Sequence, residues 1–65
     1  MNERLLRITD VGTMIGYSET VVKQMVKANK FPPPIRPLGC RQNRWVLSEV
    51  QNWIADQVKQ NREAA

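Results

Sequence analysis

A cluster of prolines limits what the middle of this chain can fold into. All four prolines of the sequence lie in the stretch "FPPPIRP", residues 31–37. Proline has no backbone N–H and a fixed φ, so a helix cannot cross this stretch and a strand within it can only be an edge strand. The sequence therefore predicts helices before Phe31 and after the turn that follows, with an extended segment between them.

Two short helices are predicted before the prolines. Thr9 is the expected N-cap of the first helix, and its apolar face carries Val11, Met14 and Ile15 at helical spacing. Gly16 is expected to end this helix after about two turns. A helix this short needs packing against a neighbour in order to be stable.

The second helix follows almost at once. Ser18 is its expected N-cap, and Asn29 is suited to a left-handed residue at its C-terminal end. Val22, Met25 and Val26 form its core-facing side. Two short helices joined by a tight turn that contains glycine are typical of a helix-turn-helix.

A third helix is predicted from Glu49 to Arg62. Ser48 and Gln51 have the spacing of an N-terminal capping box. The apolar residues that follow recur at helical spacing and are expected to close the core: Val50, Trp53, Ile54 and Val58.

The segment between the second and third helices is interpreted as a β-hairpin. "IRPL" and "RWVL" are its expected strands, with "GCRQN" as the turn. In the second strand Arg44 and Val46 are expected to point outward, and Trp45 and Leu47 inward. Phe31, Ile35 and Leu38 are expected to anchor the segment in the core. A proline-rich ligand for an aromatic groove is the alternative, although it would need an exposed, repetitive segment.

Composition argues against an enzyme. The 65 residues include one cysteine, no histidine and six acidic residues that are scattered along the chain. These residues offer no metal-ligand cluster and no pair of nucleophile and base, and a chain of this size has no room for a deep substrate cavity. We therefore expect no catalytic residue, no metal, no cofactor and no small-molecule substrate.

The placement of charge is more informative than its sum. The net charge is +4, and no acidic residue lies between Glu19 and Glu49. Six basic residues fall in that interval: Lys23, Lys27, Lys30, Arg36, Arg41 and Arg44. Such segregation favours a polyanionic partner, with a solvated basic face as the alternative.

A double-stranded DNA interface is predicted from these residues. Thr20, Lys23 and Gln24 would face the major groove, where glutamine can pair with adenine and lysine can reach guanine. Ser18, Lys27 and Lys30 would hold phosphates. The predicted hairpin would lie beside the second helix as a basic wing, and it would add Arg36, Arg41, Gln42, Asn43 and Arg44. Of these, Arg41 is ranked first as a DNA contact. The four aromatic residues are expected in the core rather than as stacking platforms: Tyr17, Phe31, Trp45 and Trp53.

Three stretches together resemble a known family. They resemble the AlpA-like phage regulators, and they are "RLLRITDV", "GYSETVVKQMVKANKFP" and, from Arg41 on, R-x-x-x-W-x-x-S-E-V-Q-x-W-I. These are small winged helix-turn-helix proteins related to phage excisionases and to MerR-type domains, and the resemblance covers Arg4 to Ala55. The chain departs from the usual pattern at Lys23 and Gln24, where aromatic residues and arginine are frequent. It also departs at Gly12 and near Pro37, where the segment is one residue longer.

The resemblance implies a fold and a role. The fold is mainly α with a small β-hairpin: a winged helix-turn-helix of three helices and a basic wing, one domain over residues 1–65 with a frayed tail from 57. The implied role is transcriptional control in a phage or prophage, or excisionase-like bending of an attachment site, in the cytoplasm of a bacterial cell and without a membrane. An integrase, or further DNA-bound copies, would be partners. The alternative is a protein-binding inhibitor or antirepressor on the same scaffold.

Overall fold

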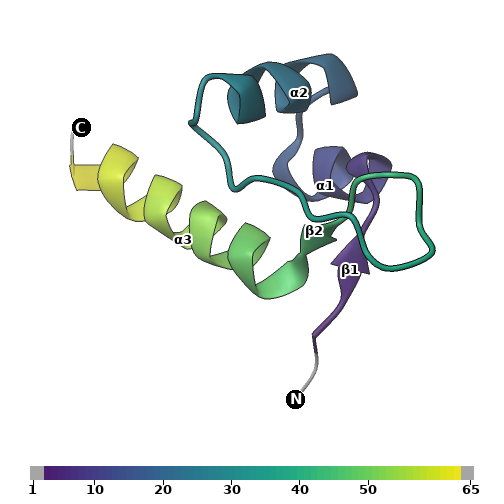
Figure 1. Ribbon diagram of the computed structural model, residues 1–65. Helices are drawn as coiled ribbons and strands as arrows, with labels where there is room; N and C mark the ends of the chain where they lie inside the picture. Colours follow the sequence, from purple (N-terminus) through teal and green to yellow (C-terminus); the bar gives the residue numbers. More distant parts are fainter. Residues whose placement is uncertain (1–2, 64–65) are drawn as a thin grey trace.

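A short antiparallel ribbon joins the start of the chain to the segment before the last helix (Figure 1). Leu5 lies opposite Val46 and Leu6 opposite Trp45. The computed structural model describes residues 3–63. Its elements follow in the order β1 (Leu5–Leu6), α1 (Ile8–Ile15), α2 (Glu19–Lys27), β2 (Trp45–Val46) and α3 (Leu47–Glu63). The predicted fold class, three helices with a small antiparallel pair in a winged helix-turn-helix, is confirmed.

The predicted pairing partner of the second strand is wrong. β2 pairs with β1, while "IRPL" contributes only one bridge, between Ile35 and Arg44. That bridge has two hydrogen bonds, from Ile35 N–H to the Arg44 carbonyl at 2.7 Å and from Arg44 N–H to the Ile35 carbonyl at 2.8 Å. A longer ladder does not form because the next residues that would donate to it, Pro33 and Pro37, have no N–H. We call residues 35–44 the wing, the teal-to-green loop that leads into β2 in Figure 1.

α1 begins earlier than the sequence indicated. Arg7, and not Thr9, is its N-cap residue, and the backbone N–H of Arg7 donates to the Asp10 carboxylate at 3.1 Å. Thr9 lies inside the first turn, and Asp10, three residues after the N-cap, reaches back to its N–H as the acidic residue of a capping box does. Gly16 ends the helix as predicted, with φ at 80° and its N–H bonded to the Gly12 carbonyl at 2.8 Å.

Both predicted ends of α2 are confirmed. The Ser18 hydroxyl accepts a hydrogen bond from the Val21 N–H at 3.3 Å. At the other end Asn29 is left-handed with φ at 61°, and the Lys30 N–H reaches back to the Met25 carbonyl at 2.8 Å. This is the hydrogen-bond pattern of a Schellman motif.

The predicted capping box of α3 is wrong. The helix begins at Leu47, directly after β2, so Ser48 lies in its first turn. Both the backbone N–H and the hydroxyl of Ser48 donate to the Glu3 carboxylate, at 3.0 and 2.8 Å. The hydrogen bond from the backbone of Ser48, followed by that from its hydroxyl, lowers the pKa of Glu3. The N-terminus of α3 is therefore capped by a residue 45 positions away in the sequence.

α3 extends into the predicted tail. It is helical to Glu63, and the Asn61 side-chain amide donates to the Gln57 carbonyl one turn earlier, at 2.8 Å. The rest of the predicted tail, residues 64–65, lies outside the described residues. Between residues 3 and 63, none of the helices combines the length and the apolar character that crossing a membrane requires.

Every segment contributes one side chain to the core. Among residues 3–63, the six buried apolar side chains come from β1, α1, α2, the proline-rich segment, β2 and α3 in turn: Leu6, Val11, Val22, Phe31, Trp45 and Val50. Partly buried residues surround them, among them Ile15, Met25 and Trp53. A core this thin depends on all of its segments at once.

Five apolar residues expected in the core are instead exposed, and one of them is Val58 of α3, at 44%. Met14 and Tyr17 are 40% and 48% exposed, and Ile35 is 44% exposed. Leu38 has an exposure of 106% and touches no part of the core. The single bridge of the wing explains the last two: with no ladder to fold them back, Ile35 and Leu38 leave the body of the protein.

Candidate nucleic-acid interface

The exposed face of α2 gathers the residues predicted to meet DNA. Consecutive residues of a helix are about 100° apart, which places Thr20, Lys23, Gln24 and Lys27 in one stripe opposite the buried Val22. All four are exposed. The caps at Ser18 and Asn29 hold the helix to this short length, so the stripe occupies nearly all of it.

The turn after α2 is anchored from α3. The Trp53 indole N–H donates to the Lys30 carbonyl at 2.9 Å, and the Trp53 ring meets Phe31 edge-on, with centroids 4.8 Å apart. The Trp45 indole N–H donates to the Pro32 carbonyl at 3.0 Å. Both tryptophans therefore hold the proline-rich segment against the core. The wing begins from this fixed segment.

The wing is organised by its own polar side chains. Arg36 donates to the Asn43 side chain at 3.5 Å, and Arg44 donates to the Gln42 side chain at 3.3 Å and to the Asn43 carbonyl at 3.1 Å. The Arg41 side chain is exposed and makes no hydrogen bond within residues 3–63. Of the wing residues, Arg41 is therefore the one whose donors are most available to a partner.

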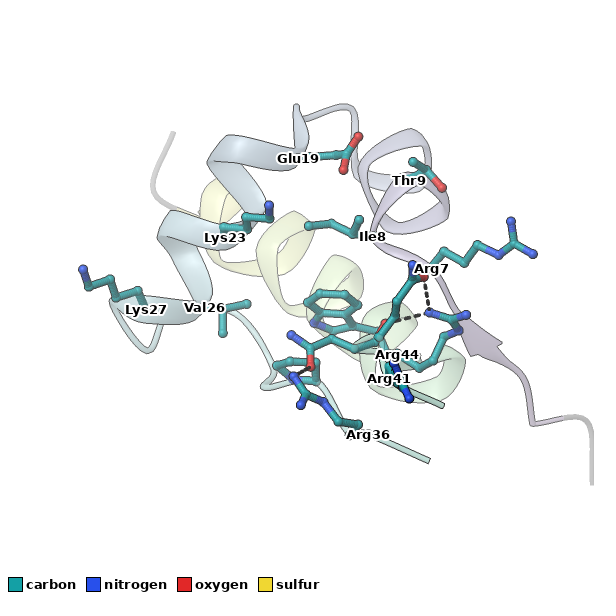
Figure 2. A pocket seen from close by; sticks show the side chains of 14 residues that line it. Arg7, Ile8, Thr9, Glu19, Lys23, Val26, Lys27, Arg36, Arg41 and Arg44 are labelled. Atoms are coloured by element: carbon teal, nitrogen blue, oxygen red, sulfur yellow. Dashed lines mark hydrogen bonds between the residues drawn. The ribbon is translucent and has the colours of Figure 1, made fainter. Parts of the chain in front are cut away.

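A groove of about 740 Å³ separates α2 from the wing. Figure 2 shows Lys23 on the side of α2 that faces Ile8, whereas Lys27 points outward from the end of α2. Seven of the predicted residues line this α2–wing groove: Lys23, Lys27, Arg36, Arg41, Gln42, Asn43 and Arg44. The other four, Ser18, Thr20, Gln24 and Lys30, lie outside its lining.

Two charged residues of the groove were missed from the sequence. Arg7, at the start of α1, and Glu19, at the start of α2, both line it. Arg7 lies outside the interval that has no acidic residues, so the segregation of charge gave no reason to include it. The pairing of β1 with β2 was the missing information, because it brings the start of α1 beside the wing.

The chemistry of the groove is that of an anion-binding surface. It combines six cationic side chains with a single carboxylate, that of Glu19. Lysine and arginine in this arrangement can neutralise phosphates, and arginine can bind them through two parallel hydrogen bonds. Among the described residues there is no group of three or more His, Cys, Asp or Glu that could hold a metal ion.

Comparisons with known proteins show which family the chain resembles. Residues 4–58 match the family model described as "Prophage CP4-57 regulatory protein (AlpA)". A relative in Enterobacteria phage P4, named "Uncharacterized protein ORF88", is 32% identical over 56 residues. The match covers 86% of this chain and 62% of the phage protein, so the chain spans less than two thirds of that relative's length. No solved structure matches the chain.

Proposed function

The chain belongs to the AlpA family of prophage regulatory proteins, and on this basis we propose that it regulates phage or prophage genes by binding double-stranded DNA. The observation that carries the proposal is the α2–wing groove. There, cations of a short exposed helix lie across one groove from cations of the wing and from Arg7 at the start of α1. A solvated basic face would not need cations on both sides of one groove.

The groove is suited to one phosphate strand of a duplex. The exposed stripe of α2 would enter the major groove, and the wing would lie over the neighbouring minor groove. The sugar–phosphate backbone between the two grooves would then run between Lys23 on one side and Arg41 and Arg44 on the other. Gln24 lies outside the groove on the same exposed stripe, where it could read base edges instead of phosphates.

Two uses of this binding are included in the proposal. One is transcriptional control, and the other is excisionase-like bending of an attachment site beside an integrase. A single domain of this size reads few base pairs, so we propose that it acts as several adjacent copies or with a DNA-bound partner. The site of action would be the bacterial cytoplasm.

The salt dependence of binding tests the proposal. Each neutralised phosphate contributes about −0.9 to the slope of log K against log salt, so four to six contacts predict a slope of roughly −4 to −5. Mobility-shift titrations against random duplex DNA at several salt concentrations would measure it. If duplex DNA does not bind even at low salt, the proposal is wrong.

Arg41 provides the matched variant. Arg41→Ala should weaken binding to all duplexes and flatten the slope by about 1. Lys59→Ala removes an equal charge from the exposed side of α3, outside the groove, and should leave the slope nearly unchanged. Equal effects of the two variants would show that net charge, and not the groove, drives binding.

A further inference from the structure

Leu38 is displayed at the tip of the wing. It is the most exposed of the large apolar side chains of the described residues, at 106% against 48% for the next, Tyr17. A fully exposed leucine gains nothing from folding, since apolar side chains stabilise a protein only when they leave water. Its position therefore needs an explanation outside the core.

The tip is a defined turn and not a loose loop. The Cys40 N–H donates to the Pro37 carbonyl at 2.9 Å, and Gly39 has φ at 79°. A left-handed glycine at the third position is the requirement of a type II turn, and it places Leu38 at the second position, the outermost corner. The Cys40 thiol also donates to the Gln42 carbonyl at 3.3 Å, which ties the tip to the rest of the wing.

The surroundings of Leu38 indicate a polyanionic partner. Arg36 and Arg41 flank the turn in the sequence, both are exposed, and the nearest acidic residues are Glu19 and Glu49. A protein partner would favour a wider apolar patch, whereas the exposed apolar side chains of the wing are Leu38 and, at 44%, Ile35, and both stand among cations. Proteins that bend DNA insert such apolar wedges, leucine among them, between base steps in the minor groove.

We infer that Leu38 is a wedge that enters the minor groove, partly unstacks a base step and bends the duplex toward the major groove. The inference rests on the proposed function, because it requires that α2 and the wing bind DNA. The flanking arginines would hold the two phosphate strands of a groove about 6 Å wide, which admits the tip of a turn. Flexible pyrimidine–purine steps should be preferred, since they unstack most easily.

The bend can be measured on a short duplex. The probe is a duplex of roughly 30 base pairs, well below the persistence length of ~150 base pairs, with donor and acceptor dyes at its ends. One central TA step carries 2-aminopurine in place of adenine, so that unstacking raises its fluorescence. Saturating protein should raise both the energy transfer and the 2-aminopurine fluorescence, and less so on a stiff A-tract duplex.

Leu38→Ala isolates the wedge. Because Leu38 touches no core residue, this variant should keep the wild-type melting temperature. It should bind the duplex within about threefold of wild type, mainly through phosphates, yet lose most of the bend and of the fluorescence change. Val58→Ala is the matched control, since it shortens another exposed apolar side chain, on α3, and should bend DNA like wild type.

The outcomes separate the two proposals. If wild type and Leu38→Ala bend the duplex equally, or if neither bends it while both bind, the wedge is wrong and the proposed function stands. If the wild-type protein shows no salt-sensitive binding to any duplex, the proposed function fails and the wedge fails with it. Cleavage by Fe–EDTA tethered to Cys40, the only cysteine of the chain, would locate the tip independently through the strand offset typical of the minor groove.

Discussion

Replacing Gly12 by alanine should destabilise the protein, although helix propensity alone predicts the opposite. Gly12 lies within α1, and alanine there would gain about 1 kcal/mol of intrinsic helix stability. A Cβ at this position, however, would lie 2.6 Å from the Tyr17 carbonyl oxygen. The obstacle is backbone and not the end of a flexible side chain, so it cannot be removed by a change of rotamer.

The net effect follows from comparing the two terms. Forcing an extra carbon into a closely packed site costs typically about 1–3 kcal/mol. Because the obstacle is backbone, we expect a cost in the upper part of that range, about 2–3 kcal/mol, which leaves a net loss of about 1–2 kcal/mol after the gain in propensity. For a domain of this size each kcal/mol lowers the melting temperature by about 4–8 °C. Far-UV circular dichroism during thermal and urea unfolding would measure both quantities.

Thr13→Ala is the control for the same helix. Thr13 is exposed, and its hydroxyl bonds only to the Thr9 carbonyl one turn earlier, at 3.0 Å. The change should stay within about 0.5 kcal/mol of wild type. If Gly12→Ala is as stable as wild type or more so, the Tyr17 carbonyl moves away easily. The close approach of the turn to α1 is then not what requires glycine.

Three further changes test separate parts of the structure. Glu3→Gln should destabilise the protein at neutral pH. A carboxylate whose pKa is lowered in the folded state stabilises the folded protein at pH values above its ordinary pKa of 4.5. It loses that contribution as the pH falls through the lowered pKa, so the melting temperatures of the two proteins should converge in acid. If the melting temperatures of wild type and Glu3→Gln differ by the same amount at every pH, the Glu3 carboxylate does not cap Ser48. Gln24→Ala should reduce the preference for specific over random duplexes in competition titrations, and equal losses on both would remove Gln24 from base reading. Arg7→Gln should flatten the salt slope of duplex binding by about 1 while leaving the melting temperature equal or higher; a lower melting temperature with an unchanged slope would make Arg7 structural.

Local signals were sufficient for the helix-turn-helix. Gly16, Ser18 and Asn29 each act on backbone groups only a few residues away, so their roles could be predicted from neighbouring sequence. The apolar spacing of α2 placed Val22 in the core for the same reason. A face opposite that core position then followed from helix geometry alone.

Long-range contacts were the ones that the sequence did not predict. The Glu3 cap acts on Ser48 from 45 residues away, and the local match to a capping box concealed it. Gly12 is a short-range case: Tyr17 is only five residues away, but its carbonyl oxygen approaches the position of a Gly12 Cβ only once the turn has folded. Leu38 shows a different difficulty. Apolar character predicts burial on average, and nothing in the sequence around it marks an exception.

The ribbon of β1 and β2 accounts for the cations that face one another in the groove. The ladder ends at Leu6 opposite Trp45, and the residues next to this last pair are Arg7 and Arg44. Both line the α2–wing groove. Like charges brought to the same end of a ribbon repel each other, so this arrangement has a cost that a polar or acidic residue at either position would avoid. Such local conflicts concentrate at functional sites, where a bound partner offsets them. A phosphate between the two guanidinium groups would remove the repulsion, which makes binding of an anion and closure of the ribbon favour each other.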